Sequence, residues 1–218
     1  MPVPNMNTSL IQREIGGPKA NFEAITERVA ARAGLLPEVF AGLQADTARI
    51  KFGCLKVLRL LSERHPVVLY PHFDQLAELL GHENSILKWG AIIIIGNLAA
   101  VDSDNKIDGL LDRYLQPISG PVLITAANTI GAAAKVALAK PHLVDKIVNA
   151  LLQVEEAKYQ TRECRNVALG HALKSLDLIF AYIRDRQRII DFAKRQLRNR
   201  RNAVRVRARA FIKNHGKT

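Results

Sequence analysis

A segment that recurs at a nearly constant interval constrains the fold of this chain more than any other feature of its sequence. Segments similar to SILKWGAIIIIGNLAAV, residues 85–101, occur before and after it in the chain. Aligned on its Gly-containing turn, successive copies are spaced by 37, 35 and 39 residues, with these residues at equivalent positions: Arg59, Gly96, Gly131 and Gly170. A period of this length is typical of proteins built from repeated supersecondary units, each of which packs on its neighbours.

Each copy carries the pattern of a helix that is buried along one face. Three and seven residues after the start of a copy come small or branched apolar residues, such as Cys54 and Leu58 in the first copy. Offsets of three and seven lie on one face of an α-helix, so we expect each copy to pack through that face. The starting positions of the five copies are Lys51, Lys88, Leu123, Arg162 and Arg205.

A second apolar series runs between these helices and fills positions i, i+3, i+4 and i+7. Two helices per period, in alternation, predict an antiparallel helical hairpin repeated along the chain. The fold class we expect is all-α, an α-α superhelix (solenoid) of about five helical hairpins. The members of the second series are Leu36, Val39, Phe40 and Leu43; Phe73, Leu76, Ala77 and Leu80; Ile107, Leu110, Leu111 and Tyr114; Val144, Ile147, Val148 and Leu151; and, more weakly, Ile189, Phe192 and Ala193.

The segments LKWGAIIIIGNL, TAANTIGAAA, CRNVALGHAL and VRVRARAFIK resemble the inner helices of the HEAT and armadillo class of helical repeats, with HEAT the closer match. The resemblance covers nearly all of residues 35–214 and implies a HEAT-like repeat fold. It also implies a protein-binding role, because most members of the class are scaffolds. In that class a basic residue of the inner helix meets an acidic residue of a neighbouring unit, which implies such ion pairs for Lys51, Lys88, Arg162 and Arg205, with acids such as Asp46, Glu83 or Glu156.

The sequence predicts one repeat domain with short appendages. Residues 1–20 hold three prolines and a Gly-Gly pair without periodicity, so we expect a loose N-terminal arm. Residues 21–214 are assigned to a single HEAT-like repeat domain whose last hairpin, 184–214, is basic. Residues 215–218 are expected to be a frayed tail.

Targeting and metal-binding signals are missing from the sequence as given. The N-terminal residues lack the basic and apolar regions of a secretory signal, and the longest apolar run is too short for a membrane span. Cys54 and Cys164 lie far apart without the spacing of metal ligands, which favours reduced thiols. We therefore expect a cytoplasmic protein without a metal or another cofactor.

Charge is distributed very unevenly along the chain. From Met1 to Ile183 there are 19 Lys and Arg against 18 Asp and Glu, whereas from Arg184 to Thr218 there are 13 against 2. A solvated helix face normally mixes both signs. The block therefore indicates either an anionic partner or a polar cap on the last unit of the array, and both interpretations stay open.

Helical geometry also predicts which residues form the surface of the array. Offsets of two, five, nine and about thirteen from the start of each copy point away from the predicted core. We expect this face, which is polar and mildly basic, to bind a partner together with the arginines of the basic block. The predicted partner-binding residues are Lys56, Arg64, Asn97, Asn128, Lys135, His171, Lys174, Arg198, Arg200, Arg201, Arg205, Arg207 and Arg209.

These observations lead to three hypotheses for function. The first is a non-enzymatic scaffold that binds an acidic protein or peptide segment through its concave face and its basic C-terminal hairpin. The alternative is a nucleic-acid binder whose C-terminal arginines contact phosphates. A variant of the HEAT-like DNA glycosylases is the third and least favoured, because the Asp that follows the family's Trp by four residues is replaced after Trp89 by Ile93. No catalytic residues are predicted, since acids, bases and nucleophiles do not gather on one face.

Overall fold

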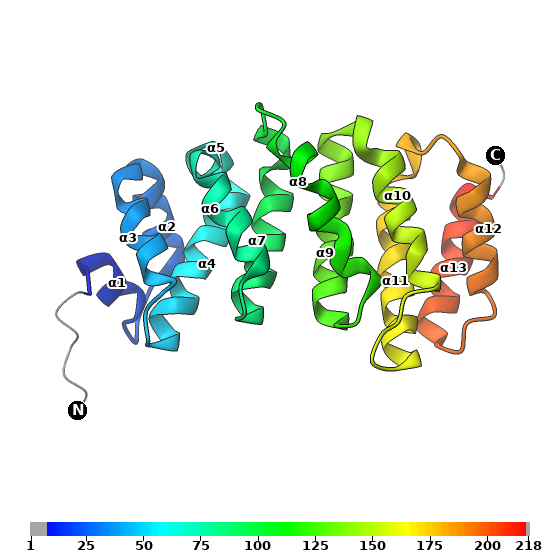
Figure 1. Ribbon diagram of the computed structural model, residues 1–218, viewed down its shortest axis with the longest axis horizontal. Coiled ribbons are helices and arrows are strands. Elements are labelled where there is room, and N and C mark those ends of the chain that lie inside the picture. The colour runs from blue at the N-terminus through cyan, green and yellow to red at the C-terminus, as the bar shows by residue number, and fades with distance from the viewer. Residues whose placement is uncertain (1–7, 217–218) are drawn as a thin grey trace. The chain divides into compact units, whose positions relative to one another are not determined.

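The computed structural model describes residues 8–216, and within them the chain folds into α-helices and short 3-10 turns without a strand (Figure 1). These helices form two compact units, of which the first ends at Val101 and the second begins at Asp102. The boundary falls inside the range 21–214 that the repeat pattern assigned to one domain. The all-α repeat architecture is confirmed.

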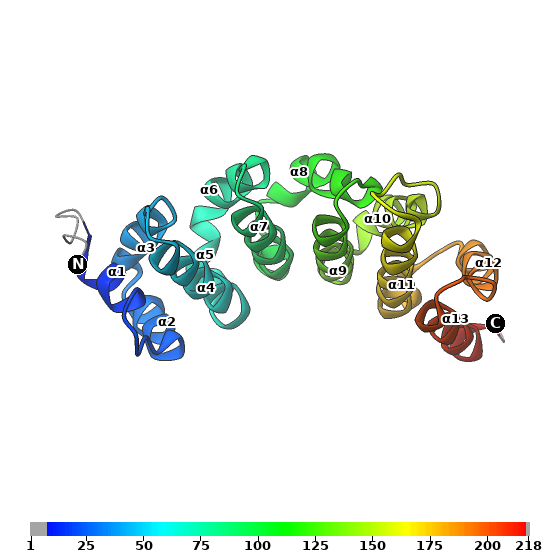
Figure 2. The same cartoon turned by 90° about the horizontal axis from the view of Figure 1, so that it is seen from below.

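The first unit is organised around its longest helix, α4, which packs on α2, α3 and α7. Figure 2 shows α2, α4 and α7 along one side of this unit and α3 and α6 along the other. A short separate helix, α5, precedes α6 and α7, which gives this repeat the three-helix form found in armadillo proteins. The helices are α1 (Leu10–Ile15), α2 (Phe22–Ala31), α3 (Leu36–Gly42), α4 (Ala48–Arg64), α5 (Pro66–Leu69), α6 (Phe73–Glu78) and α7 (Ser85–Leu98).

The loose arm expected over residues 1–20 is wrong for α1. Ser9 accepts a hydrogen bond from the amide of Gln12, whose side chain accepts one from the amide of Ser9, so the helix begins with a capping box. Ile11 and Ile15 are buried, and α1 packs on α3 and α4. Residues 1–7 lie outside the described part of the chain.

The second unit has two layers, which Figures 1 and 2 show from two directions. We call α9, α11 and α13 the inner layer and α8, α10 and α12 the outer layer. Within the inner layer, α11 packs on both α9 and α13, and the three helices run in the same direction (Figure 1). The helices are α8 (Lys106–Leu115), α9 (Leu123–Ala139), α10 (Val144–Leu152), α11 (Arg162–Ile179), α12 (Arg186–Gln196) and α13 (Asn202–His215).

Both apolar periodicities of the sequence are buried in the structure. In the first repeat Cys54 and Leu58 are fully buried on α4, and the equivalent Ala126 and Ile130 are fully buried on α9. The intervening helices bury the second series against them. The five predicted hairpins are confirmed as α3 with α4, α5 and α6 with α7, α8 with α9, α10 with α11, and α12 with α13.

A buried ammonium group holds the start of the second unit. The Lys140 Nζ lies 3.0 Å from Asp102 Oδ2 and 3.2 Å from the Asp102 carbonyl oxygen, and it donates to Asn105 Oδ1 at 2.6 Å. The side chains of Lys140 and Asp102 are only 6% and 0% exposed. The Asp102 carboxylate also accepts hydrogen bonds from the amides of Lys106 and Ile107 at the first turn of α8. One lysine thus joins the beginning of α8 to the end of α9.

Asp108 closes this cluster on its exposed side. Its Oδ2 lies 3.4 Å from Lys140 Nζ, and its Oδ1 lies 2.5 Å from His142 Nε2. Burial alone would raise the pKa of Asp108, but hydrogen bonds from His142 and Lys140 outweigh it and the pKa lies below its ordinary value. The carboxylate therefore stays charged beside the ammonium.

Replacement of the buried ammonium should destabilise the protein strongly. We expect Lys140→Met to lower the free energy of unfolding by about 3–5 kcal/mol, because it leaves Asp102 charged, buried and without its cation. Urea denaturation followed by circular dichroism measures this change. The matched control is Lys146→Met, which removes an exposed ion pair with Asp112 and should cost less than about 1 kcal/mol. Equal effects of the two substitutions would contradict the structural role of Lys140.

Candidate binding surface

The inner layer of the second unit presents a continuous exposed stripe on each helix. On α9 the stripe includes the half-buried Asn128 and the exposed Lys135, and on α11 the half-buried His171 and the exposed Lys174. All four were predicted from helical offsets, and the structure brings them to neighbouring helices that pack on each other. We call the exposed stripes of α9, α11 and α13 together the inner surface.

Hydrogen bonds between helices fix the register of this surface. The buried Ser175 hydroxyl of α11 donates to the Ile130 carbonyl of α9 at 3.0 Å. The Arg207 guanidinium of α13 donates to the Gly170 carbonyl of α11 at 2.8 Å. Gly170 suits this position because a Cβ there would lie only 3.3 Å from Arg207 Nη1. The Gly170–Arg207 contact lies near the middle of α11 and α13, and the Ser175–Ile130 contact joins the last turns of α11 to the middle of α9.

Ion pairs join the two ends of α11 to α13. Near its first turn Glu163 pairs with Arg201, and near its last turn Asp177 Oδ1 lies 2.6 Å from His215 Nε2. The His215 ring also stacks on Phe180, with ring centroids 4.0 Å apart, and lies beside Phe211. The two carboxylates of α11 therefore each have a partner.

His171 lies half-buried among positive charges. Burial lowers its pKa first, and the charges of Arg207 and Lys174 lower it further. Because an imidazolium would be repelled by both neighbours, His171 is neutral at neutral pH. A neutral ring beside two cations leaves the local charge to Arg207 and Lys174.

The inner layer as a whole is strongly basic. Lys and Arg number one on α9, three on α11 and four on α13, whereas the carboxylates of the three helices are Glu163 and Asp177. The cations of these three helices therefore outnumber the carboxylates, both of which are already paired. This excess of one sign exceeds what a polar cap requires, because capping needs polarity without a preferred charge.

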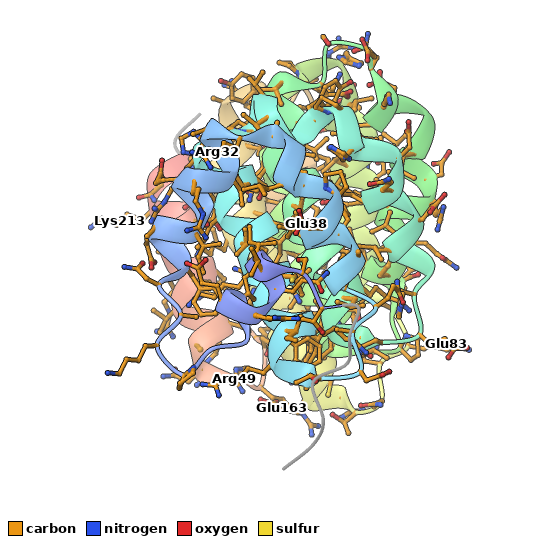
Figure 3. The ribbon with its side chains drawn as sticks, turned by 90° about the vertical axis from the view of Figure 1, so that its left-hand side faces the viewer. Arg32, Glu38, Arg49, Glu83, Glu163 and Lys213 are labelled. Carbon is orange, nitrogen blue, oxygen red and sulfur yellow. The ribbon has the colours of Figure 1, made fainter. Side chains whose placement is uncertain are left out.

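The C-terminal arginines fall into two groups. Arg201, Arg205 and Arg207 make intramolecular contacts: Arg201 pairs with Glu163, Arg205 donates to the carbonyls of Asn199 and Arg200, and Arg207 donates to Gly170. Arg198, Arg200 and Arg209 are exposed and form no ion pair with any described residue. Lys213, which the sequence prediction did not include, extends from α13 into solvent (Figure 3).

The predicted binding residues of the first unit take part in contacts of their own. The Lys56 ammonium lies over the Phe22 ring, 4.2 Å from its centroid. Arg64 Nη1 lies 3.5 Å from Glu27 Oε1, and the Asn97 amide donates to the Ser62 hydroxyl at 2.9 Å. These contacts link neighbouring helices of the first unit, so the three side chains have a structural role there.

The ion pairs implied by the family resemblance are not found in the described chain. Lys51, Lys88 and Arg162 make no ion pair there, and the Arg205 guanidinium binds backbone carbonyls and Asn202. The charged residues that do join neighbouring repeats occupy other positions, such as Arg195 with Glu155.

Sequence reasoning missed the exposed apolar residues of the inner layer, which are Ile124, Leu138, Leu178 and Val206. Leu138 follows Lys135 by three residues on α9, and Leu178 follows Lys174 by four on α11, with 36% and 57% of their surfaces exposed. The signal was present, because these intervals continue the exposed stripe by one turn. Because apolar residues are usually assigned to the core, these residues were not included in the predicted binding surface.

The described residues were also searched for a metal site, a membrane-spanning helix and a reactive thiol. Across residues 8–216, no group of three His, Cys, Asp or Glu side chains is placed to hold a metal ion. No helix in that range is long and apolar enough to cross a membrane. Cys54 is buried, which raises the pKa of its thiol to about 12 and makes it unreactive.

Comparison with known proteins identifies the architecture. No family model matches the sequence, and no curated protein matches it either. Among solved structures, a designed armadillo repeat protein superposes with a TM-score of 0.65 at 15% identity, over 97% of this chain and 94% of that one. An engineered protein superposes with a TM-score of 0.54 at 14% identity, over 95% and 87%. The chain has an armadillo-like helical repeat fold.

Removal of a neighbouring charge should shift the titration of His171. We expect Arg207→Gln or Lys174→Gln to raise the pKa of His171 toward its ordinary value, because each substitution removes a repelling cation. Titration of the imidazole resonances by NMR measures the shift. Lys158→Gln, an exposed lysine on the loop before α11, is the control and should leave the pKa unchanged. A downward shift in either variant would show that His171 faces a different environment.

Proposed function

We propose that this armadillo-like repeat chain is a non-enzymatic scaffold that binds an acidic segment of a partner protein. The segment lies on the inner surface of the second unit, against Lys135 and Lys174, and extends toward the exposed arginines of the C-terminal hairpin. The family resemblance supports a protein-binding role, because helical repeats of this class mostly act as scaffolds. A cytoplasmic location fits the same proposal.

The excess of Lys and Arg over Asp and Glu on α9, α11 and α13 supports this proposal. Lys174 and Lys135 are exposed on adjacent helices whose only two carboxylates, Glu163 and Asp177, are paired with other residues. Arg207 adds a third cation next to Lys174 through its position beside His171. An acidic segment would be complementary in charge to this basic surface, which favours specific binding.

The outer layer of the same unit differs from the inner surface in how its charges are paired. A hollow of about 530 Å³ between α10 and α12 is lined by the acidic residues Glu155 and Glu156 together with Arg188 and Arg195. Arg195 binds Glu155 through two hydrogen bonds, of 2.7 and 3.1 Å. In this hollow Arg195 is therefore paired with a carboxylate of the protein, and the more basic inner surface is the better candidate for an anionic partner.

Nucleic acid is the second candidate, and the exposed Arg198, Arg200 and Arg209 are the observation that favours it. These three guanidiniums form no internal ion pair with a described residue and would reach phosphates. Of the other arginines that the sequence assigned to phosphates, Arg201 pairs with Glu163, whereas Arg205 and Arg207 donate to backbone carbonyls and keep their charge. Three phosphate contacts predict a modest salt dependence, with a slope of log affinity against log salt of about −3 on duplex DNA.

Charge reversal on the inner surface should weaken binding of an acidic chain. We expect Lys135→Glu/Lys174→Glu to lower the affinity for fluorescent poly-L-glutamate roughly tenfold or more, because two attractive contacts become repulsive. Fluorescence anisotropy at physiological salt measures the affinity, and Lys158→Glu serves as a control of equal charge that should retain binding.

A labelled DNA oligonucleotide provides the competing probe for the same experiment. Under the scaffold proposal it binds more weakly than poly-L-glutamate, and the double variant affects the polypeptide most. Tighter binding of DNA, lost in Arg198→Glu/Arg200→Glu and kept in Lys135→Glu/Lys174→Glu, would replace the scaffold proposal with the nucleic-acid one.

A further inference from the structure

Two cations and an imidazole form a cluster near the middle of α11, on the inner surface. α11 lies between α9 and α13 (Figure 1), and its His171 is half-buried. Lys174, one turn further along α11, and Arg207 of α13 are exposed. Both cations are close enough to lower the pKa of the imidazole. The cluster therefore holds two permanent positive charges next to a group that can gain a proton.

A hydrogen bond between helices holds Arg207 in this place. Its Nη1 donates to the carbonyl oxygen of Gly170 at 2.8 Å, and Gly170 is the residue before His171. A guanidinium carries several N–H donors, so this bond leaves others for an anion. The packing of α11 on α13 thus brings the third member of the cluster to the other two.

The carboxylates of α11 are engaged elsewhere. Glu163 lies in the first turn of the helix and pairs with Arg201, and Asp177 lies in the last turn and pairs with His215. Neither carboxylate contributes to the pKa shift of His171, which comes from burial first and then from Arg207 and Lys174. The electrostatic environment of the imidazole is therefore positive.

Other elements packed on α11 also carry titratable groups, and none of these groups is a source of the shift. The elements include the turns η7 (Gln153–Glu155) and η8 (Phe180–Tyr182). The groups are Lys135 of α9, Asp145 and Lys146 of α10, Glu155 of η7 and Tyr182 of η8.

We propose that His171, Lys174 and Arg207 form one anion site, which accepts a carboxylate of the partner segment while His171 takes up a proton from solvent. This inference rests on the proposed function and specifies how its site is regulated. The acidic segment binds more tightly at mildly acidic pH, and the protonation of one histidine sets the change in affinity.

A bound carboxylate reverses the electrostatics at His171. In the chain alone an imidazolium is repelled by Lys174 and Arg207, and burial opposes it as well. A carboxylate beside these cations offsets their repulsion and attracts the imidazolium, so the pKa of His171 is higher in the complex. The proton and the carboxylate then strengthen each other's binding by the same factor. Affinity falls as the pH rises from the pKa of the free chain to that of the complex, and it is constant outside this interval.

The pH dependence of peptide binding tests the inference with the full chain. The probe is a fluorescent peptide of aspartate and serine, whose carboxylates have an ordinary pKa of about 3.9 and stay charged between about pH 5.5 and 8. We expect fluorescence anisotropy to show about three- to tenfold tighter binding at the lower pH, because a tenfold change corresponds to about one unit between the two pKa values of His171.

Variants assign this pH dependence to one residue. His171→Gln should remove the difference in affinity between the two pH values, because an amide takes up no proton. His72→Gln is the matched control, because His72 lies in the first unit, where it hydrogen-bonds to Gln75, and this variant should keep the difference. Circular dichroism verifies that each variant is folded. A difference that persists in His171→Gln overturns the inference.

NMR titration of the unaltered chain gives a second measurement that does not depend on variants. The imidazole resonances of His171 are followed against pH without the peptide and with the peptide at saturation. We expect the pKa of His171 to be higher with the peptide bound, and an unchanged or lower pKa overturns the inference.

The outcomes separate this inference from the proposed function. Binding that is equal at both pH values and is lost in Lys135→Glu/Lys174→Glu overturns the inference and leaves the acidic-segment scaffold standing. Failure of the peptide to bind at either pH overturns both. A DNA oligonucleotide that raises the pKa of His171 when the peptide does not overturns the carboxylate as the ligand of this site.

Discussion

The structure depends on the burial of one face of each inner helix against its neighbours. Residues such as Ala126 and Ile130 on α9 and Ala168 and Leu169 on α11 are at most 5% exposed. Small side chains at these contacts let the helices approach closely, and branched ones fill the space that remains. Because α9, α11 and α13 bury equivalent faces, their opposite faces form one surface in the second unit.

This constraint explains why the fold could be read from the sequence. Burial at offsets of three and seven leaves a periodic trace, as at Cys54 and Leu58, and a trace repeated five times specifies the hairpins. The break at Val101 and the helix α1 left weaker signals. The boundary between the two units is not marked by a characteristic residue type. The capping box of Ser9 and Gln12 does indicate a helix, but the prolines in the same N-terminal segment favoured an irregular structure.

The binding surface could be predicted only in part, for a physical reason. Exposure follows from helical geometry, so Asn128, Lys135, His171 and Lys174 were placed correctly on the surface. Charge pairing depends on residues far apart in the chain: Arg201 meets Glu163 across 38 positions, and Arg207 meets the carbonyl of Gly170 across 37. A block of positive charge in the sequence therefore contains both structural and available cations, and only the folded chain distinguishes them.

The ammonium of Lys140 has a consequence for the modularity of the protein. It binds both the carboxylate and the carbonyl of Asp102, the residue with which the second unit begins, and that carboxylate also holds the first turn of α8. All of these contacts come from residues of the second unit. We therefore expect the first turn of α8 to keep these contacts when residues of the preceding repeats are substituted.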